Sequence, residues 1–221
     1  MLEVRWLGHS AFELATSVGK VLIDPFLNEN PLAPIKAKDV AEAKLIVVTH
    51  DHFDHLGDAV EIARRTGAKI VAVPELAASL EGVEAVAVNM GSYVDVEGVK
   101  VALVQAFHTA TKGAPVGCVV SADGVTVYHA GDTALFGDMR LIGEVYGPDV
   151  ALLPIGGYYT MGPREAAIAV SLIRPKVAIP MHYATFPVLV KGPEEFVEEV
   201  RRRAPGVRVV VLRPGESFRL P

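Results

Sequence analysis

The 221-residue chain has little of several features that mark large classes of protein. Its single cysteine, Cys118, excludes a disulfide bond within the chain and is typical of a reducing compartment. Basic residues are outnumbered by acidic ones, 21 to 26, and the net charge of −5 disfavours a large basic surface for nucleic acid. The sequence also contains no glycine-rich phosphate loop of the Walker or Rossmann type.

Long apolar runs are missing as well. Runs such as residues 45–48 are far shorter than the roughly 18 residues that span a bilayer, so no membrane span is expected. The first residues lack the basic and then apolar segments of a secretory signal, which favours a cytoplasmic location. No linker or low-complexity run interrupts the chain, and 51% of its residues are hydrophobic. We therefore expect one domain over residues 1–221 with a substantial core.

Short strand-like and helix-like segments alternate along the chain. Strands are expected at residues 3–7, 11–16, 20–23, 45–48, 69–73, 83–88, 93–96, 99–107, 116–121, 125–129, 150–154, 177–180 and 207–212. Helices are expected at residues 58–66, 74–80, 138–145, 163–173 and 193–203. Helices near both ends and a β-rich centre favour a layered α/β fold with two sheets. This pattern alone does not indicate a function.

A cluster of histidines and aspartates directly follows the apolar run at residues 45–48. Residues 49–55 read Thr-His-Asp-His-Phe-Asp-His and hold three of the seven histidines. His50 and His52 alternate in an extended loop and can direct their imidazoles to one side, whereas Asp54 and His55 follow a turn and can face a second position. Imidazole and carboxylate ligands suit zinc and its first-row neighbours, so this segment predicts a metal site.

Three later residues at expected strand ends qualify as further ligands. His108 follows the strand expected at 99–107, Asp132 follows Gly131 just beyond 125–129, and His182 follows 177–180. Loops beyond the carboxyl ends of strands are where chemistry concentrates in α/β proteins. Because four ligands cannot complete two metal shells, we expect these three residues to converge on the first cluster.

Together these residues resemble the metallo-β-lactamase superfamily, and the resemblance covers nearly the whole chain. The segments 8–10, 22–25, 153–157, 160–163 and 180–183 resemble more narrowly a compact family of metal-dependent hydrolases, related to the ascorbate-phosphate lactonase and N-acyl-lipid phospholipase D types. The resemblance implies an α/β fold of the αββα sandwich kind, with two mixed β-sheets flanked by helices and the site at one edge of both sheets.

Carried over residue by residue, the resemblance implies seven metal ligands. One ion would be held by His50, His52 and His108, the other by Asp54, His55 and His182, with Asp132 bridging both. The implied cofactors are two divalent ions, Zn²⁺ first, with Mn²⁺, Ni²⁺ or Fe as other candidates. A water or hydroxide shared by the ions would cleave a small ester, lactone or phosphoester. The expected partner is a small-molecule substrate, with a homo-oligomer as a further candidate.

Other residues near these motifs have two interpretations each. Asp54 would also orient the nucleophile and receive its proton. His9, at a strand end, would contact substrate or shuttle a proton, or only hydrogen-bond locally. Asp24 would orient a ligand imidazole, or form a plain Asp-Pro turn. Asp51 is expected to brace the ligand loop, and His129 to be structural.

Three alternative functions remain open on this sequence. A nuclease or phosphodiesterase acting on RNA or DNA would show binding that depends steeply on salt. In the related di-iron redox proteins a glutamate normally replaces the second histidine, where this chain has His52. A catalytically silent metal-binding module that serves assembly is the third.

Overall fold

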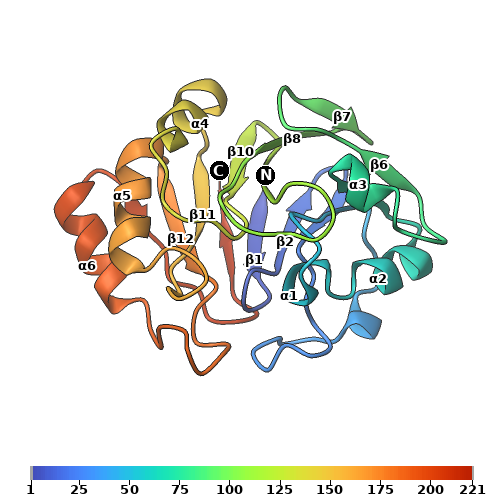
Figure 1. The fold of residues 1–221 in the computed structure, drawn as a ribbon, viewed down its shortest axis with the longest axis horizontal. Coiled ribbons are helices and arrows are strands. Elements are labelled where there is room, and N and C mark those ends of the chain that lie inside the picture. Colours follow the sequence, from blue (N-terminus) through green and yellow to red (C-terminus); the bar gives the residue numbers. More distant parts are fainter. Residues whose placement is uncertain (1, 221) are drawn as a thin grey trace.

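Two seven-stranded sheets form the centre of the molecule in a computed structural model that describes residues 2–220 (Figure 1). The first sheet has the order β14(Ser217–Arg219), β1(Glu3–Trp6), β2(Phe12–Thr16), β3(Gly19–Ile23), β4(Leu45–Val47), β5(Lys69–Ala72), β6(Ala85–Ala87). The second has the order β7(Val94–Val96), β8(Val99–Gln105), β9(Val116–Ala122), β10(Val125–His129), β11(Val150–Pro154), β12(Val177–Met181), β13(Arg208–Val209).

Both sheets are mixed and follow the same pairing pattern. From β14 to β3 the neighbouring strands are antiparallel, and from β3 to β6 they are parallel. From β7 to β10 they are likewise antiparallel, and from β10 to β13 parallel. Each strand of the first sheet therefore has a counterpart at the same position in the second sheet, and the ends of the paired counterparts are equivalent.

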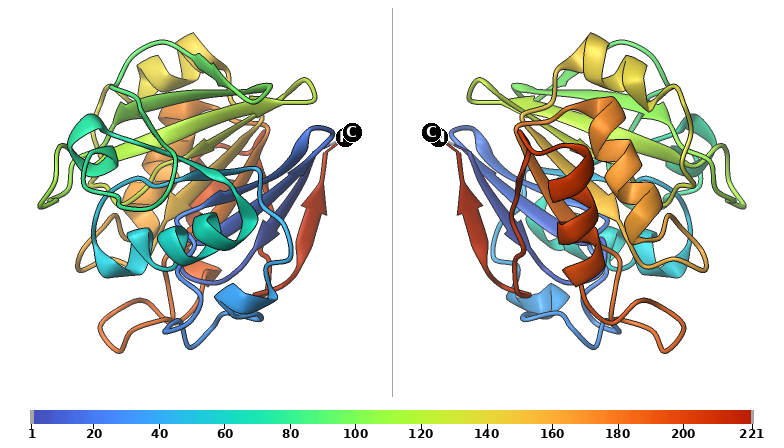
Figure 2. Two further views of the ribbon diagram at one scale, coloured as in Figure 1. Left: turned by 90° about the vertical axis from the view of Figure 1, so that its right-hand side faces the viewer. Right: turned by 90° about the vertical axis from the view of Figure 1, so that its left-hand side faces the viewer.

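Helices cover the outer sides of the two sheets (Figures 1 and 2). On the first sheet lie η1(Ala37–Asp39), α1(Phe53–Leu56), α2(Ala59–Thr66) and α3(Pro74–Ala77). On the second lie α4(Met139–Tyr146), α5(Pro163–Ile173) and α6(Glu194–Arg203). The longest, α5, has 11 residues, so none of the helices formed by residues 2–220 could cross a bilayer. The expected αββα sandwich with two mixed sheets is confirmed.

Strand burial explains the apolar runs in the sequence. Every residue of β4, β11 and β12 is buried, because these strands are covered by helices on one face and by the other sheet on the opposite face. In β1 only alternate residues, Val4 and Trp6, are buried. The hydrophobic core accordingly lies between the sheets and beneath the helices.

Several elements differ from the sequence-based expectation. The strand expected at 207–212 is the two-residue β13, and the helix expected at 74–80 ends at Ala77. Three elements were not expected: η1; α1, which replaces the turn before Asp54; and β14, which pairs with β1 from the far end of the chain. Most other boundaries agree within two residues.

Candidate metal centre

The histidine-rich segment leaves β4 and turns at once into α1. His52 is the residue that caps the amino end of α1, and its carbonyl accepts hydrogen bonds from the backbone of His55 and Leu56 at 3.0 and 2.9 Å. Asp54 and His55 thus stand on a helical turn and are buried. This single turn places Asp54 in a group with His9, His55 and His182, whereas the ring of His55 also lies 4.1 Å from that of His50 between centroids.

The carboxylate of Asp24, at the end of β3, anchors this segment from beneath. Asp24 is fully buried and accepts hydrogen bonds from the Thr49 backbone at 2.8 Å, the Thr49 hydroxyl at 2.7 Å and His55 Nδ1 at 2.7 Å. Since the Thr49 hydroxyl donates to Asp24, its oxygen accepts from His50 Nδ1 at 3.0 Å. Asp24 and Thr49 therefore hold Nδ1 of His55 and His50, so that Nε2 of each faces another candidate ligand, Asp132 and His52 respectively.

One group of possible ligand atoms comes from two loops that face each other across the site. Ligand atoms of His50, His52 and His108 lie within 4.8 Å of one another. His50 Nε2 and His52 Nδ1 are 3.0 Å apart, and the His108 ring centroid is 5.2 and 5.1 Å from those of His50 and His52. The structure thus brings together the three residues that the resemblance assigned to one ion.

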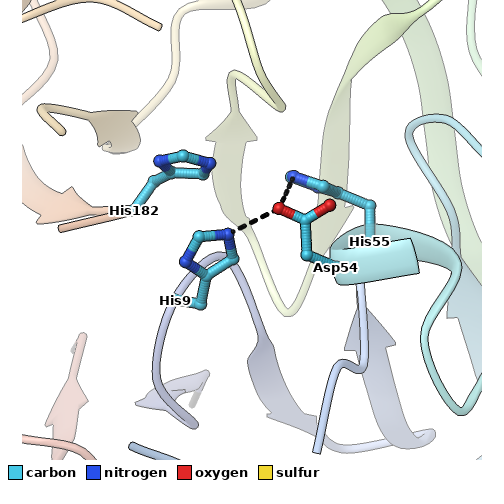
Figure 3. A group of neighbouring side chains, drawn as sticks. All are labelled: His9, Asp54, His55 and His182. Atoms are coloured by element: carbon cyan, nitrogen blue, oxygen red, sulfur yellow. Dashed lines mark hydrogen bonds and ion pairs between the residues drawn. The ribbon is translucent and has the colours of Figure 1, made fainter. Parts of the chain in front are cut away.

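A second group gathers around Asp54 (Figure 3). Ligand atoms of His9, Asp54, His55 and His182 lie within 4.8 Å of one another. Asp54 Oδ2 is 3.0 Å from His9 Nε2 and 3.9 Å from His55 Nε2, and Figure 3 shows His182 facing the same space from the opposite side. This group contains the three residues expected at the other ion, together with His9.

Asp132 lies between the two groups. Its Oδ1 is 3.2 Å from His55 Nε2, and its Oδ2 is 3.2 Å from His182 Nε2 and 3.6 Å from His108 Nε2. Asp132 is buried, and it forms a third cluster with His50 and His55. The carboxylate is therefore within 3.6 Å of candidate ligands from both groups.

Three buried polar atoms of the candidate ligands have no hydrogen-bond partner: His55 Nε2, Asp132 Oδ1 and His182 Nδ1. His55 Nε2 and Asp132 Oδ1 lie close to each other but form no directed hydrogen bond. An unpartnered buried nitrogen or carboxylate oxygen is costly unless something else satisfies it. Because imidazole nitrogens and carboxylate oxygens are the ligands that Zn²⁺ and its neighbours take, these residues fit the implied metals.

The charges of the centre follow from burial and from its carboxylates. Burial lowers the pKa of His50 to about 2 and also lowers that of His108, so both imidazoles are neutral. Burial opposes the charge on Asp132 too, but the adjacent His182 and His55 outweigh it and hold its pKa well below the usual range. Burial likewise disfavours protonated His55, yet Asp132 and Asp24 raise its pKa well above 6.5. A proton on His55 thus lies where a metal ion would replace it.

His9 lies behind Asp54 rather than in the wall of the cavity. It is fully buried, and its pKa is lowered to about 4 by burial and by His182. Since the carboxylate can only accept, His9 Nε2 donates to Asp54, and neutral Nδ1 is left to accept from the Thr185 hydroxyl at 2.9 Å, which is nearer to that hydroxyl than its other acceptor, the Tyr183 carbonyl at 3.2 Å. Thr185 was missed by sequence analysis, because only the fold brings this ordinary loop threonine to His9.

The remaining sequence-based expectations concern residues outside the ligand groups. Asp51 Oδ1 accepts the Thr111 backbone N–H at 2.8 Å, which joins the loops of His50 and His108. His129 donates to the Ser10 carbonyl and accepts from Gly131, so both ring nitrogens have structural partners. Cys118 is buried in β9.

A cavity of about 640 Å³ opens over the centre, a size typical of small-molecule sites. Side chains that belong to the ligand groups form its floor: His52, Asp54, His108, Asp132 and His182. Its walls are Phe53, Thr109, Tyr159, Phe186, Pro187 and Val188. A small molecule in this cavity can therefore reach both ligand groups.

Comparison with known proteins agrees with this architecture. The model of the β-lactamase superfamily domain matches residues 3–182. The chain is 53% identical to a UPF0173 metal-dependent hydrolase of Thermofilum pendens over the full length of both proteins. It is 52% identical to another from Methanopyrus kandleri, with 98% of this chain and 99% of that protein covered.

The solved structure of Igni18, a metallo hydrolase from Ignicoccus hospitalis, is similar throughout. Its TM-score is 0.93 at 41% identity, and the match covers 100% of this chain and 99% of that one. A metal-dependent hydrolase structure from Parabacteroides distasonis, at 23% identity and a TM-score of 0.78, shares the fold. The chain therefore belongs to the metallo-β-lactamase superfamily, among its metal-dependent hydrolases.

Proposed function

We propose that the chain hydrolyses a small ester, lactone or phosphoester at a centre of two divalent ions, with Zn²⁺ as the first candidate. One ion would be held by His50, His52 and His108, the other by Asp54, His55 and His182, and Asp132 would contact both. The observation that carries the proposal is the convergence of these side chains from loops of both sheets into groups of ligand atoms within 4.8 Å. Bound there, the ions would supply a water of lowered pKa and a Lewis acid for the scissile group.

A side-chain nucleophile is not needed for this reaction, and the cavity does not offer a good one. The cavity walls and floor contain neither serine nor cysteine. Cys118 is buried in β9, and burial raises the pKa of its thiol well above the usual range, which suppresses the reactive thiolate. Water is therefore the nucleophile that this site favours.

Asp54 is the residue placed to accept the proton of that water. Burial opposes its ionised form, but the hydrogen bond from His9 and the adjacent His55 outweigh burial and lower the pKa of Asp54. Asp54 lines the cavity, whereas His9 does not. We therefore assign proton transfer to Asp54, and to His9 the role of holding Asp54 ionised and correctly turned.

Metal content tests the proposal most directly. Purified protein saturated with Zn²⁺ and freed of excess metal is expected to hold two equivalents by elemental analysis. His52→Ala and His182→Ala each remove a ligand of one ion, so each variant is expected to retain about one equivalent and to lose hydrolysis of a panel of phosphodiester, phosphomonoester, lactone and thioester substrates. Asp132→Ala is expected to weaken both sites.

Glu144→Gln changes an exposed carboxylate on α4 and serves as the matched control, with two equivalents retained. Circular dichroism confirms that each variant is folded. Two equivalents of zinc in folded His52→Ala and His182→Ala, or full turnover in either, would contradict the assignment. Homo-oligomerisation and a cytoplasmic location stay predictions from the sequence.

A further inference from the structure

Large apolar side chains are exposed around the mouth of the cavity. The exposed fraction is 64% for Phe53, 55% for Tyr159 and 49% for Val188. Phe186 and Pro187 complete the rim. Single exposed apolar residues are common on protein surfaces, but a group of them around one cavity marks a place where apolar surface is buried on binding.

Two parts of this rim, at Phe53 and at Phe186, belong to segments that carry candidate ligands. Phe53 stands between His52 and Asp54 at the start of α1, and Phe186 follows His182 by four residues. The rings of Phe53 and Phe186 lie 6.2 Å apart between centroids. The part of a substrate that contacts Phe53 and Phe186 is therefore held at a set distance from the candidate metal ligands.

The rim is held in place by its own backbone. In the loop after β12, Leu189 N donates to Phe186 O at 3.1 Å and Val190 N to Gly156 O at 3.0 Å. The loop that carries Tyr159 is joined to the residue after Asp132 by a hydrogen bond from Met161 N to Thr133 O at 3.0 Å. A preorganised apolar wall binds without a large ordering cost.

Lysine and arginine are missing from the lining of this cavity: among residues 2–220, the eleven residues that line it include neither. The cation next to the rim in sequence, Lys191, donates to the carbonyls of Phe186 and Pro187 at 3.1 and 2.9 Å, so it is engaged in holding the loop. Sites that select phosphate groups generally place arginine or lysine on them.

We infer that the substrate is a carboxylic ester or lactone whose group beside the scissile bond is an uncharged alkyl or aryl group, packed between Phe53, Tyr159 and the Phe186–Val188 segment. This rests on the proposed hydrolysis and narrows its substrate class. The reaction adds water across the acyl–oxygen bond: the bond breaks, the acid keeps the incoming oxygen, and the alcohol leaves with a proton. Phosphomonoesters and nucleotides are disfavoured because the ions alone would have to neutralise their charge, with no lysine or arginine of the rim to assist.

Binding tests the apolar wall separately from catalysis. The probe is 4-nitrophenyl hexyl ether, which cannot be hydrolysed, titrated by calorimetry into protein stripped of metal with EDTA and into zinc-loaded protein. Both forms are expected to bind it. Phe53→Ala and Tyr159→Ala are expected to raise Kd about tenfold each, since each removes a large part of the wall. Val145→Ala, which removes an exposed side chain on α4 outside the cavity, is the control and leaves Kd unchanged.

Turnover then tests the substrate class. With zinc-loaded protein, kcat/KM is expected to rise from 4-nitrophenyl acetate to the butyrate and hexanoate, by up to about fourfold for each methylene that is buried. We expect kcat/KM for 4-nitrophenyl phosphate to be lower than kcat/KM for 4-nitrophenyl hexanoate. Phe53→Ala and Tyr159→Ala are expected to flatten the rise with chain length.

The outcomes separate the two proposals. Ether binding that is unchanged in Phe53→Ala and Tyr159→Ala, or a phosphate ester that is a better substrate than the hexanoate, overturns the inference. Ether binding that weakens as expected, in a zinc-loaded protein that hydrolyses neither the esters nor the phosphate, supports the apolar occupant and overturns the proposed hydrolysis.

Discussion

At the scale of single residues, the centre depends on side chains that contact the candidate ligands from behind. Asp24 and Thr49 select the tautomers of His55 and His50, and Thr185 does the same for His9. Three non-glycine residues here, His9, Asp24 and His182, have φ angles of 54°, 45° and 55°. Such left-handed backbone costs about 1–3 kcal/mol per residue and persists where the surroundings enforce it. The contacts around the centre therefore hold these three residues in a backbone conformation that they would otherwise avoid.

Thr185 provides a residue-scale prediction. In Thr185→Val the His9 Nδ1 atom loses its donor, so His9 no longer favours the tautomer that donates from Nε2 to Asp54. Because that hydrogen bond helps to lower the pKa of Asp54, its loss raises this pKa. The acid limb of the kcat/KM profile is then expected to move to higher pH, with kcat reduced about tenfold.

Thr185→Ser keeps the hydroxyl and is expected to restore both the profile and the rate. The measurement is the pH dependence of ester hydrolysis for the three proteins, with zinc content checked in each. A Thr185→Val profile that overlays the wild type would show that the hydroxyl does not act through His9.

At the scale of elements, the sequence predicted what depends on local pattern. The run at 45–48 and the expected helix at 58–66 were found as β4 and α2, because continuous apolar residues and a Gly67 stop are local signals. α1 was missed because its four residues carry ligand chemistry instead of an apolar periodicity. β14 was missed because its partner β1 lies more than 200 residues away.

In the candidate metal centre, too, the sequence predicted the residues that a local pattern marks and missed those that only distant contacts bring in. The seven candidate ligands were recognised through strand ends and a family resemblance, and the structure brings all seven together. Thr185 and the Phe186–Val188 part of the rim depend on loop paths that no local pattern encodes. Tertiary contacts between distant loops therefore account for what the sequence did not predict.

Gly131 determines how Asp132 reaches the centre from β10. Its φ is 60°, and a Cβ there would lie 2.5 Å from Val116 O and 3.2 Å from Thr49 Cβ. Gly67, which ends α2, has a φ of 77° but open space around the same position. The two glycines therefore share the left-handed backbone and differ in how closely other atoms approach.

We expect Gly67→Ala to lower the free energy of unfolding by about 1 kcal/mol, the cost of a left-handed alanine. Gly131→Ala adds the collision with Val116 and is expected to cost about 2 kcal/mol more. It should also displace Asp132 and reduce bound zinc. Urea unfolding and elemental analysis measure both effects. Equal stability losses in the two variants would mean that the backbone angle alone explains Gly131.

At the scale of the whole molecule, the candidate centre joins the two halves of the sandwich. His50, His52, Asp54 and His55 follow β4 of the first sheet, whereas His108, Asp132 and His182 follow strands of the second. The shared pairing pattern also places His9 after β1 where His108 follows β8, and Asp24 after β3 where Asp132 follows β10. Ions bound there would connect the sheets, and their removal is expected to lower the stability of the entire fold.

Removing the metal is expected to cost more stability as the pH rises. In metal-free protein Asp132 and Asp24 hold the pKa of His55 well above 6.5, while the unfolded chain releases this proton near pH 6.5. The native state then binds more protons above pH 6.5, so its free energy of unfolding falls with rising pH, by at most about 1.4 kcal/mol per unit from this group. In zinc-loaded protein a ligand His55 carries no proton on Nε2, and this dependence disappears. Thermal unfolding at pH 6.5, 7.5 and 8.5, with excess zinc and with EDTA, should show a difference in Tm that widens at each step. A difference that stays constant or narrows would mean that no ion replaces the proton held between Asp24 and Asp132.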